Sequence, residues 1–242
     1  MLNIVHTTDL HGHSSILKKL PKPSDDVILL DSGDAILGSC TVFKFHEPIF
    51  EEMNLANFSA MTMGNREFSY FPKVLEGRIK AINFPMLSAN FHSTKDYIHL
   101  QDFIIVEKAG VRIGITGLSP IQFSTRLLLS RIACGYFEDY VKAMKSIEAK
   151  LREQSDFIVL LSHSGLKEDM EIAKECGFIN LILAGHSHEK FSEPVYVNDT
   201  AVCHTGCYGS SYALLKIDVE SKKILSYENI VHENIKKCSK IY

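Results

Sequence analysis

The chain has 242 residues, of which 45% are hydrophobic and 23% are charged, and its formal net charge is −3. A chain of this length can bury a full core, so we expect one ordinary globular domain or at most two small ones. Nucleic-acid polymers and anionic membranes select clustered excess lysine and arginine, so neither is expected as a partner. A local site can still hold a small anionic substrate.

The N-terminal stretch MLNIVHTTDL enters a strand-like run directly, without a basic segment followed by an apolar stretch and a cleavage site. No apolar run of the sequence approaches the ~20 residues needed to span a bilayer. We therefore expect a soluble protein of the cytoplasm.

Six cysteines are scattered through the chain. A chain of this size does not depend on disulfides, so reduced thiols are expected. Cys203 and Cys207 flank His204 in the segment CHTGC, and a structural zinc site is one alternative there. Because the sequence shows no second ligand pair of comparable spacing, ordinary buried or edge-strand thiols are favoured.

Short apolar runs rich in Ile, Val and Leu recur along the chain, and each ends in a polar cluster. Runs of this length fit strands buried on both faces better than they fit helices. The expected strands cover residues 2–9, 26–34, 59–65, 84–91, 112–119, 156–164, 180–188 and 212–219. The polar cluster then marks the C-terminal end of each strand.

Helical patterns lie between several of these strands, at residues 46–56, 137–154 and 166–177. The first has an acidic first turn, and the second carries its apolar residues along one stripe. Gly177 is expected to end the third helix in a left-handed conformation. Strands that alternate with helices predict a layered α/β domain.

Two segments, 104–115 and 212–229, predict β-hairpins that add to this domain. The most irregular region is 119–137, which is either a surface loop or lid, or an ordinary connection packed by its leucines. The sequence contains no internal repeat, low-complexity segment or flexible linker.

Five of the expected strand ends carry carboxylate, amide or imidazole groups. Sites in open α/β sheets form just beyond the carboxyl ends of strands, so these five segments are expected to converge. One such residue alone is weak evidence, because an Asp there is usually a cap or turn residue. Together they supply seven N and O donors, from Asp9 and His11 in DLH, Asp34 in DSGD, Asn65 in GNRE, His163 in SHSG, and His186 and His188 in GHSH.

The donor set lacks thiolates, which points to two hard or borderline divalent ions. Mn²⁺ is the first expectation, and Fe²⁺, Zn²⁺ and Co²⁺ also suit these ligands. Two ions ~3.5–4 Å apart can clamp a phosphoryl oxygen and acidify a bridging water, so that a metal-bridging hydroxide attacks phosphorus. The pattern therefore indicates hydrolysis of a phosphoester.

The order D-x-H, G-D, G-N-x-E/D, strand-end H and G-H-x-H resembles the calcineurin-like metallophosphoesterase superfamily. The segments TTDLHGH, PMLSANF and TGCYGSSYALLKID are more narrowly similar to the catalytic domain of bacterial 5′-nucleotidases and UDP-sugar hydrolases. The resemblance implies a four-layer αββα sandwich of two mixed β-sheets flanked by helices. The implied ligands are Asp9, His11 and His188 for one metal, Asn65, His163 and His186 for the other, and Asp34 as the bridge.

Secreted members of the nucleotidase group continue into a C-terminal domain that clasps the nucleoside between aromatic rings, whereas this sequence ends at Tyr242. We therefore expect a single catalytic domain over residues 1–242, with the nucleotide-specificity domain absent. The substrate stays open among a nucleotide, a phosphodiester and a pyrophosphate, and the oligomeric state is undetermined.

The sequence also departs from the family pattern at Arg66, because the family motif G-N-H-E or G-N-H-D carries a histidine at this position. An arginine cannot act as a general acid near pH 7, because its pKa is above ~12. Its planar fork can still stabilise negative charge on phosphate oxygens. Asn65 and Arg66 are therefore the predicted catalytic residues, with Asn65 holding a phosphoryl oxygen.

Enzymes that cleave the pyrophosphate of UDP-diacylglucosamine resemble this arrangement, with G-N-R-D at the same motif. A pyrophosphate expels a good leaving group, so it needs little help from a general acid. Arg66 therefore favours diesters, pyrophosphates or activated esters over alkyl monoesters.

Several alternatives stay open. Arg66 could turn outward and pair with Glu67 or another surface acid. His6, His13 and His46 could replace the missing acid, although a histidine at such a position is more often structural. The whole chain could be a non-catalytic metal- and phosphate-binding module, or a catalytic subunit that needs a partner chain for specificity.

Overall fold

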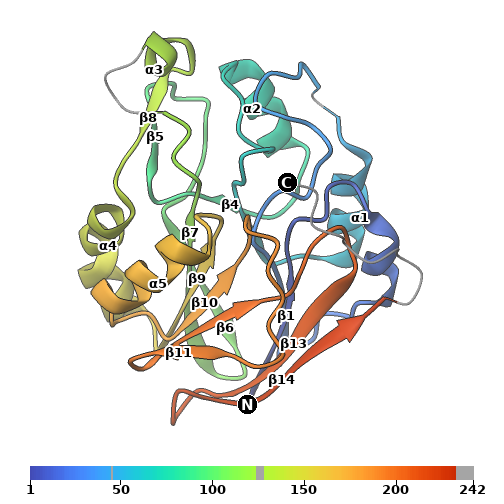
Figure 1. The fold of residues 1–242 in the computed structure, drawn as a ribbon, viewed down its shortest axis with the longest axis vertical. Helices are drawn as coiled ribbons and strands as arrows, with labels where there is room; N and C mark the ends of the chain where they lie inside the picture. The colour runs from blue at the N-terminus through green and yellow to red at the C-terminus, as the bar shows by residue number, and fades with distance from the viewer. Residues whose placement is uncertain (45, 124–127, 233–242) are drawn as a thin grey trace.

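The computed structural model describes residues 1–44, 46–123 and 128–232. Two six-stranded mixed sheets pack face to face, and helices cover the outer face of each sheet (Figure 1). This is the four-layer αββα sandwich that the family resemblance implies, so the expected fold class is confirmed.

The first sheet has the strand order β14-β13-β1-β2-β3-β4. Strands β1 to β4 run parallel to one another, whereas β13 pairs antiparallel with both β1 and β14. The strands are β1 Leu2–Thr7, β2 Val27–Asp31, β3 Ala60–Thr62, β4 Met86–Leu87, β13 Ser211–Asp218 and β14 Lys223–Val231.

The second sheet has the order β11-β12-β10-β9-β7-β6. Its four central strands are parallel, and β6 and β11 close the edges in antiparallel pairs. The strands are β6 Phe103–Lys108, β7 Val111–Leu118, β9 Phe157–Ser162, β10 Leu181–Ala184, β11 Val195–Val197 and β12 Thr200–His204.

Part of the irregular region 119–137 is regular in the structure. It contains the short helix α3 (Leu128–Ile132) and the strand β8 (Gly135–Phe137), which pairs with β5 (Phe91–Ser93) in a separate two-stranded sheet. Residues 124–127 lie outside the described part of the chain.

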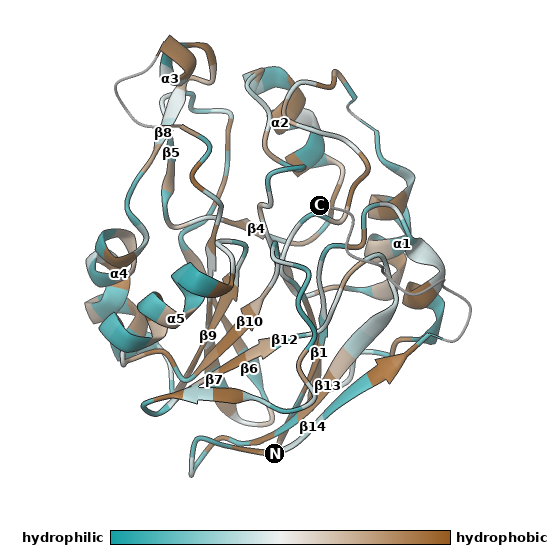
Figure 2. Cartoon of the chain, in the orientation of Figure 1, coloured by the Kyte–Doolittle hydropathy of each residue, from teal (hydrophilic) through white to brown (hydrophobic). Residues whose placement is uncertain are grey.

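The core between the two sheets explains why the central strands read as continuous apolar runs. Neighbouring strands place Ile4 and Ile28 against the inner face of the second sheet, whereas Val5 and Leu29 belong to the cluster on the opposite face. All four side chains are almost fully buried, so both faces of each strand need apolar residues. Figure 2 shows the resulting hydrophobic strands in the middle of the molecule.

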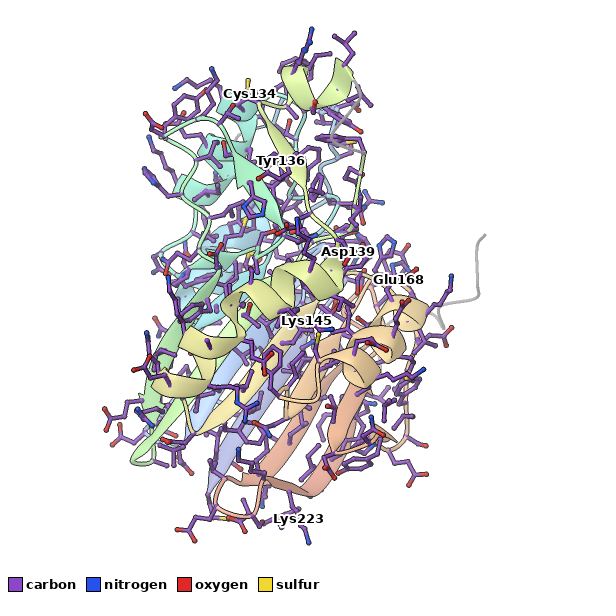
Figure 3. The ribbon with its side chains drawn as sticks, turned by 90° about the vertical axis from the view of Figure 1, so that its left-hand side faces the viewer. Cys134, Tyr136, Asp139, Lys145, Glu168 and Lys223 are labelled. Atoms are coloured by element: carbon purple, nitrogen blue, oxygen red, sulfur yellow. The ribbon has the colours of Figure 1, made fainter. Side chains whose placement is uncertain are left out.

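Helices complete the outer layers. Against the first sheet lie η1 (Ser14–Lys19), α1 (Pro48–Ala56) and α2 (Pro72–Lys80), and both α-helices begin with a proline, whose fixed φ suits a first helical residue. Against the second lie α4 (Tyr140–Gln154) and α5 (Leu166–Glu175). Figure 3 shows α4 across this sheet, with Lys145 on its outer side.

Three details differ from the sequence predictions. Helix α2 and the 3-10 helix η1 were not predicted. The prediction for Gly177 was wrong, because this glycine is absent from the positive-φ residues of the described chain. Helix α5 ends at Glu175, and Cys176 leaves it at φ −121°, so no left-handed residue is needed.

Arg78, near the C-terminal end of α2, is a fully buried cation. Its guanidinium donates to main-chain carbonyl oxygens of two loops, one after β2 and one after β3. The acceptors are the carbonyls of Ser39, Val42 and Lys44 in the first loop and of Arg66, Glu67 and Phe68 in the second. Since buried carbonyls need donors, Arg78 fixes the two loops to each other.

Arg78→Met should lower the free energy of unfolding by about 3 kcal/mol or more, because several buried carbonyls lose their donor together. Urea denaturation followed by circular dichroism measures this change. Arg112→Met is the matched control, since Arg112 is half-exposed and pairs with Asp156 at the surface. Equal losses in the two variants would contradict the role given to Arg78.

Candidate metal centre

Loops that follow five parallel strands meet at one place. The first sheet supplies the loops after β1, β2 and β3, and the second sheet supplies the loops after β9 and β10. Parallel strands end at a common edge, so side chains distant in sequence become neighbours. These loops carry all seven predicted ligand residues, Asp9, His11, Asp34, Asn65, His163, His186 and His188.

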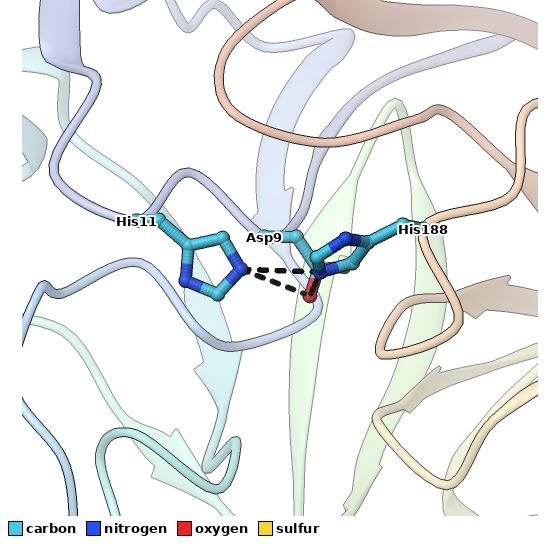
Figure 4. Close-up of side chains that lie close together, drawn as sticks. All are labelled: Asp9, His11 and His188. Carbon is cyan, nitrogen blue, oxygen red and sulfur yellow. Dashed lines mark hydrogen bonds and ion pairs between the residues drawn. The ribbon is translucent and has the colours of Figure 1, made fainter. Parts of the chain in front are cut away.

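Asp9, His11 and His188 form a first group (Figure 4). Nε2 of His188 lies 3.2 Å from Oδ1 of Asp9 and 3.2 Å from Nε2 of His11. Nε2 of His11 lies 3.8 Å from the same carboxylate oxygen. Ligand atoms that each lie ~2.1 Å from one ion are separated by about these distances, so the group can hold a divalent cation.

Asp9, Asp34 and His163 form a second group. Nε2 of His163 lies 3.4 Å from Oδ1 of Asp34 and 3.8 Å from Oδ1 of Asp9. The sequence predicts Asp34 as the carboxylate shared between two ions. In the structure, Oδ1 of Asp9 is also near the ligand atoms of both groups.

Asn65 and His186 lie beside the second group. Nδ1 of His186 is 3.0 Å from Oδ1 of Asn65, and the rings of His186 and His163 are 5.1 Å apart in an edge contact. The two residues come from different sheets, since Asn65 follows β3 and His186 follows β10. Their polar atoms therefore add one amide oxygen and one imidazole nitrogen to the donor atoms of the second group.

Buried polar atoms test whether a metal fits these residues. Oδ1 of Asp9 and Nε2 of His163 are buried and have no hydrogen-bond partner within the described residues. A buried carboxylate oxygen without a donor is costly, and a cation satisfies it. Both atoms face the centre of the donor set, so the residues present fit a metal ion.

Neighbouring groups orient His163 for this role. Its Nδ1 donates to the carbonyl oxygen of Ser32, which leaves Nε2 facing the two carboxylates, where a bound metal ion would take the place of its proton. Burial opposes a charge on this imidazole, but the carboxylates of Asp34 and Asp9 outweigh it and raise the pKa of His163 to about 10. The same negative field attracts a divalent cation.

Backbone conformation also marks this region. Asp9, His11, Asp34, His186 and His188 all have positive φ, between 46° and 70°. Left-handed conformations are unfavourable for residues with a Cβ and persist where surrounding structure over-determines them. The five residues are therefore held in place at a conformational cost.

Glu67 and Gly64 shape the loop that presents Asn65. Glu67 is buried, and its carboxylate accepts hydrogen bonds from the backbone N–H groups of Asp34, Gly64 and Ile36. A Cβ on Gly64 would lie 2.3 Å from Oδ1 of Asp34, so only glycine fits. This role of Glu67 was not predicted from the sequence, although the last residue of the GNRE motif was its signal.

Arg66 faces the site and does not pair with Glu67. Its Nε lies 3.8 Å from Oδ2 of Asp34, and Nη1 donates to the carbonyls of Leu37 and Gly38 at 3.3 and 3.4 Å. The side chain is 36% exposed, so it remains accessible to a substrate. The alternative of an Arg66–Glu67 pair is wrong, because Glu67 is directed inward at the backbone.

The three histidines considered as substitute acids lie in different surroundings. His6 is fully buried, bonds Ser32 Oγ at 2.9 Å, and has its pKa lowered to about 3, first by burial and then by the charge of His204. It cannot reach a substrate. His46 is exposed and faces Glu51 at 3.6 Å, and His13 is an exposed residue next to the first ligand loop.

The structure does not support a zinc site in CHTGC. Cys203 and Cys207 are buried, and neither belongs to a candidate metal group among the described residues. His204 instead directs Nε2 toward Oδ2 of Asp169, 3.5 Å away. Cys40, Cys134, Cys176 and Cys203 are free cysteines in the structure, and Cys238 lies outside the described residues.

A four-layer sandwich with a hard-ligand cluster at the strand ends is the architecture of a metal-dependent phosphoesterase domain. The family model for calcineurin-like phosphoesterases matches residues 2–190, so the chain belongs to this family.

Relatives within the family carry nucleotidase names. Protein UshA of Yersinia enterocolitica is 28% identical over 228 residues, covering 78% of this chain and 40% of its own length. The NAD 5′-nucleotidase of Haemophilus influenzae is 28% identical over 187 residues, covering 74% of this chain and 31% of its own length. The chain thus spans less than half of the length of these relatives.

Solved structures share the fold. The 5′-nucleotidase precursor from Thermus thermophilus aligns with a TM-score of 0.75 at 23% identity, over 95% of this chain and 54% of its own. The calcineurin-like phosphoesterase YfkN from Bacillus subtilis aligns with a TM-score of 0.69 at 19% identity, over 95% and 90% of the two chains.

Within residues 1–44, 46–123 and 128–232, no helix combines the length and the apolar character needed to cross a bilayer. The cytoplasmic location stays a prediction from the sequence.

Proposed function

We propose that this chain hydrolyses a small phosphoester, of the nucleotide type, with two divalent metal ions. The observation that carries the proposal is Oδ1 of Asp9, a buried oxygen that has no hydrogen-bond partner among the described residues and lies close to the ligand atoms of two groups. Membership of the calcineurin-like phosphoesterase family supports it, and the names of the relatives support a nucleotide as substrate.

The proposed ligands divide between the two groups. Asp9, His11 and His188 would hold one ion, Asn65, His163 and His186 would hold the other, and Asp34 would be shared between them. When bound, the two ions supply Lewis-acid activation of the phosphoryl group and of the attacking water. Mn²⁺, Fe²⁺, Zn²⁺ and Co²⁺ all suit these ligands.

The protein's own side chains then position the substrate. Asn65 offers its amide to a phosphoryl oxygen, and Arg66 presents a charged, planar set of donors next to Asp34. These donors stabilise the negative charge that develops on the phosphoryl oxygens in the transition state. Arg66 cannot protonate the leaving group, so substrates with good leaving groups are favoured.

Asp34→Asn should lower metal content and hydrolysis together, the latter by more than about 10-fold, because the buried carboxylate supports the ions. Elemental analysis of the purified variant and initial rates measure the two effects. Asp156→Asn is the control, because it changes a surface carboxylate at the opposite end of β9 from His163. Normal metal content with normal turnover in Asp34→Asn would refute the proposed site.

Arg66→Ala should lower kcat/KM by about 100-fold while metal content stays at the wild-type level, because a charge-stabilising donor is lost and no ligand is removed. Arg66→Lys keeps a positive charge without the planar fork and should recover only part of the rate. An unchanged rate in Arg66→Ala would assign this residue a structural role.

Metal-depleted protein reconstituted with Mn²⁺ should hydrolyse a UDP-sugar and both nitrophenyl esters, monoester and diester, faster than AMP, whose leaving group is an alkoxide. The physical reason is the absence of a general acid at Arg66, which penalises poor leaving groups most. Initial rates with and without the ion measure the preference. A lack of turnover with Mn²⁺, Co²⁺, Zn²⁺ and Fe²⁺, despite bound metal, would favour a binding module.

A further inference from the structure

Tyr208 lies in the loop after β12, against the loop that carries Asp9 and His11. Its backbone N–H donates to the carbonyl oxygen of Asp9 at 2.7 Å. The next residue, Gly209, approaches so closely that a Cβ there would lie 2.8 Å from the carbonyl oxygen of His13. The two loops are therefore fixed to each other through their backbones.

The ring of Tyr208 packs against two proposed ligands at once. Its centroid lies 4.8 Å from the His11 ring at 40° and 5.2 Å from the His188 ring at 79°. The two imidazoles are themselves 5.2 Å apart in an edge contact. Three rings in mutual contact restrict one another, because rotation of either imidazole would drive it into a neighbour.

Backbone strain is an independent sign that the position is special. Tyr208 has a φ of 54°, which is unfavourable for a bulky side chain. The proposed ligands Asp9, His11 and His188 share this strained conformation. Strained residues persist at functional sites when the surrounding structure over-determines them, and Tyr208 shares this conformation with the proposed ligands.

We infer that Tyr208 is a positioning residue for the ion held by Asp9, His11 and His188. Its ring fixes the planes of both imidazoles, so that their Nε2 atoms converge to 3.2 Å before an ion arrives. The inference rests on the proposed metal centre. Residues that orient metal ligands typically change metal affinity 10- to 100-fold when they are replaced.

The test is Co²⁺ titration of the metal-depleted full chain, followed by visible absorption and by calorimetry. The wild type should bind two ions. Tyr208→Leu should weaken one of them by about 10-fold or more and leave the other unchanged, because the ring packs against His11 and His188 of the first group. Tyr208→Phe keeps the ring and should bind both ions as the wild type does.

A second variant separates the ring from the fold. Tyr208→Gly removes the ring and also the strain, since glycine adopts positive φ readily. Its metal-free form should therefore unfold at no lower a temperature than that of Tyr208→Leu, while it shows the same weakening of one ion. Lys222→Gly relieves a positive φ of 55° in a distant turn and should leave both affinities unchanged.

The outcomes are distinguishable. A wild type that binds no ion would overturn the proposed metal centre together with this inference. Wild-type affinities in both Tyr208→Leu and Tyr208→Gly would overturn the inference alone. Equal weakening of both ions would also overturn it, because the ring would then support the loops in general and not this pair of imidazoles.

Discussion

The burial of Asp9 is the constraint on which the rest of the site depends. Its Oδ2 accepts hydrogen bonds from Thr8 Oγ1 and from the backbone N–H of His186, whereas Oδ1 has no hydrogen-bond partner among the described residues and faces three imidazoles. A buried charge is stable only when it is paired or coordinates a metal. The sandwich thus concentrates negative charge at one point, and a dication is the natural counter-charge.

Two buried residues that are not proposed ligands, Glu67 and Arg78, hold the loops around this charge in place. Glu67 binds backbone amides of the loops after β2 and β3, and Arg78 binds their carbonyls. The two side chains therefore fix the same pair of loops, Glu67 by accepting from their N–H groups and Arg78 by donating to their carbonyl oxygens. This rigidity explains how strained ligand residues persist, because the conformational cost is met by burial and hydrogen bonds nearby.

Much of the secondary structure was predictable because its signals are local. Apolar runs that end in polar clusters correspond to β1, β2, β9 and β10, and the amphipathic stripe at 137–154 corresponds to α4. The predictions of secondary structure failed where the local sequence pattern was short, or where tertiary contacts determined the conformation. Helix α2 spans only Pro72–Lys80, and the end of α5 is set by Cys176 and not by a left-handed glycine.

The sequence by itself determined which donors are available, since D-x-H and G-H-x-H place pairs of candidate ligands on single loops. Only the tertiary structure decided which atoms meet. The close approach of Asp9 to His188, the inward turn of Glu67 and the ring of Tyr208 against two imidazoles all depend on how two sheets pack. Periodicity encodes which face of a strand is buried, but the contacts between loops distant in sequence arise from sheet order and packing, which local patterns do not specify.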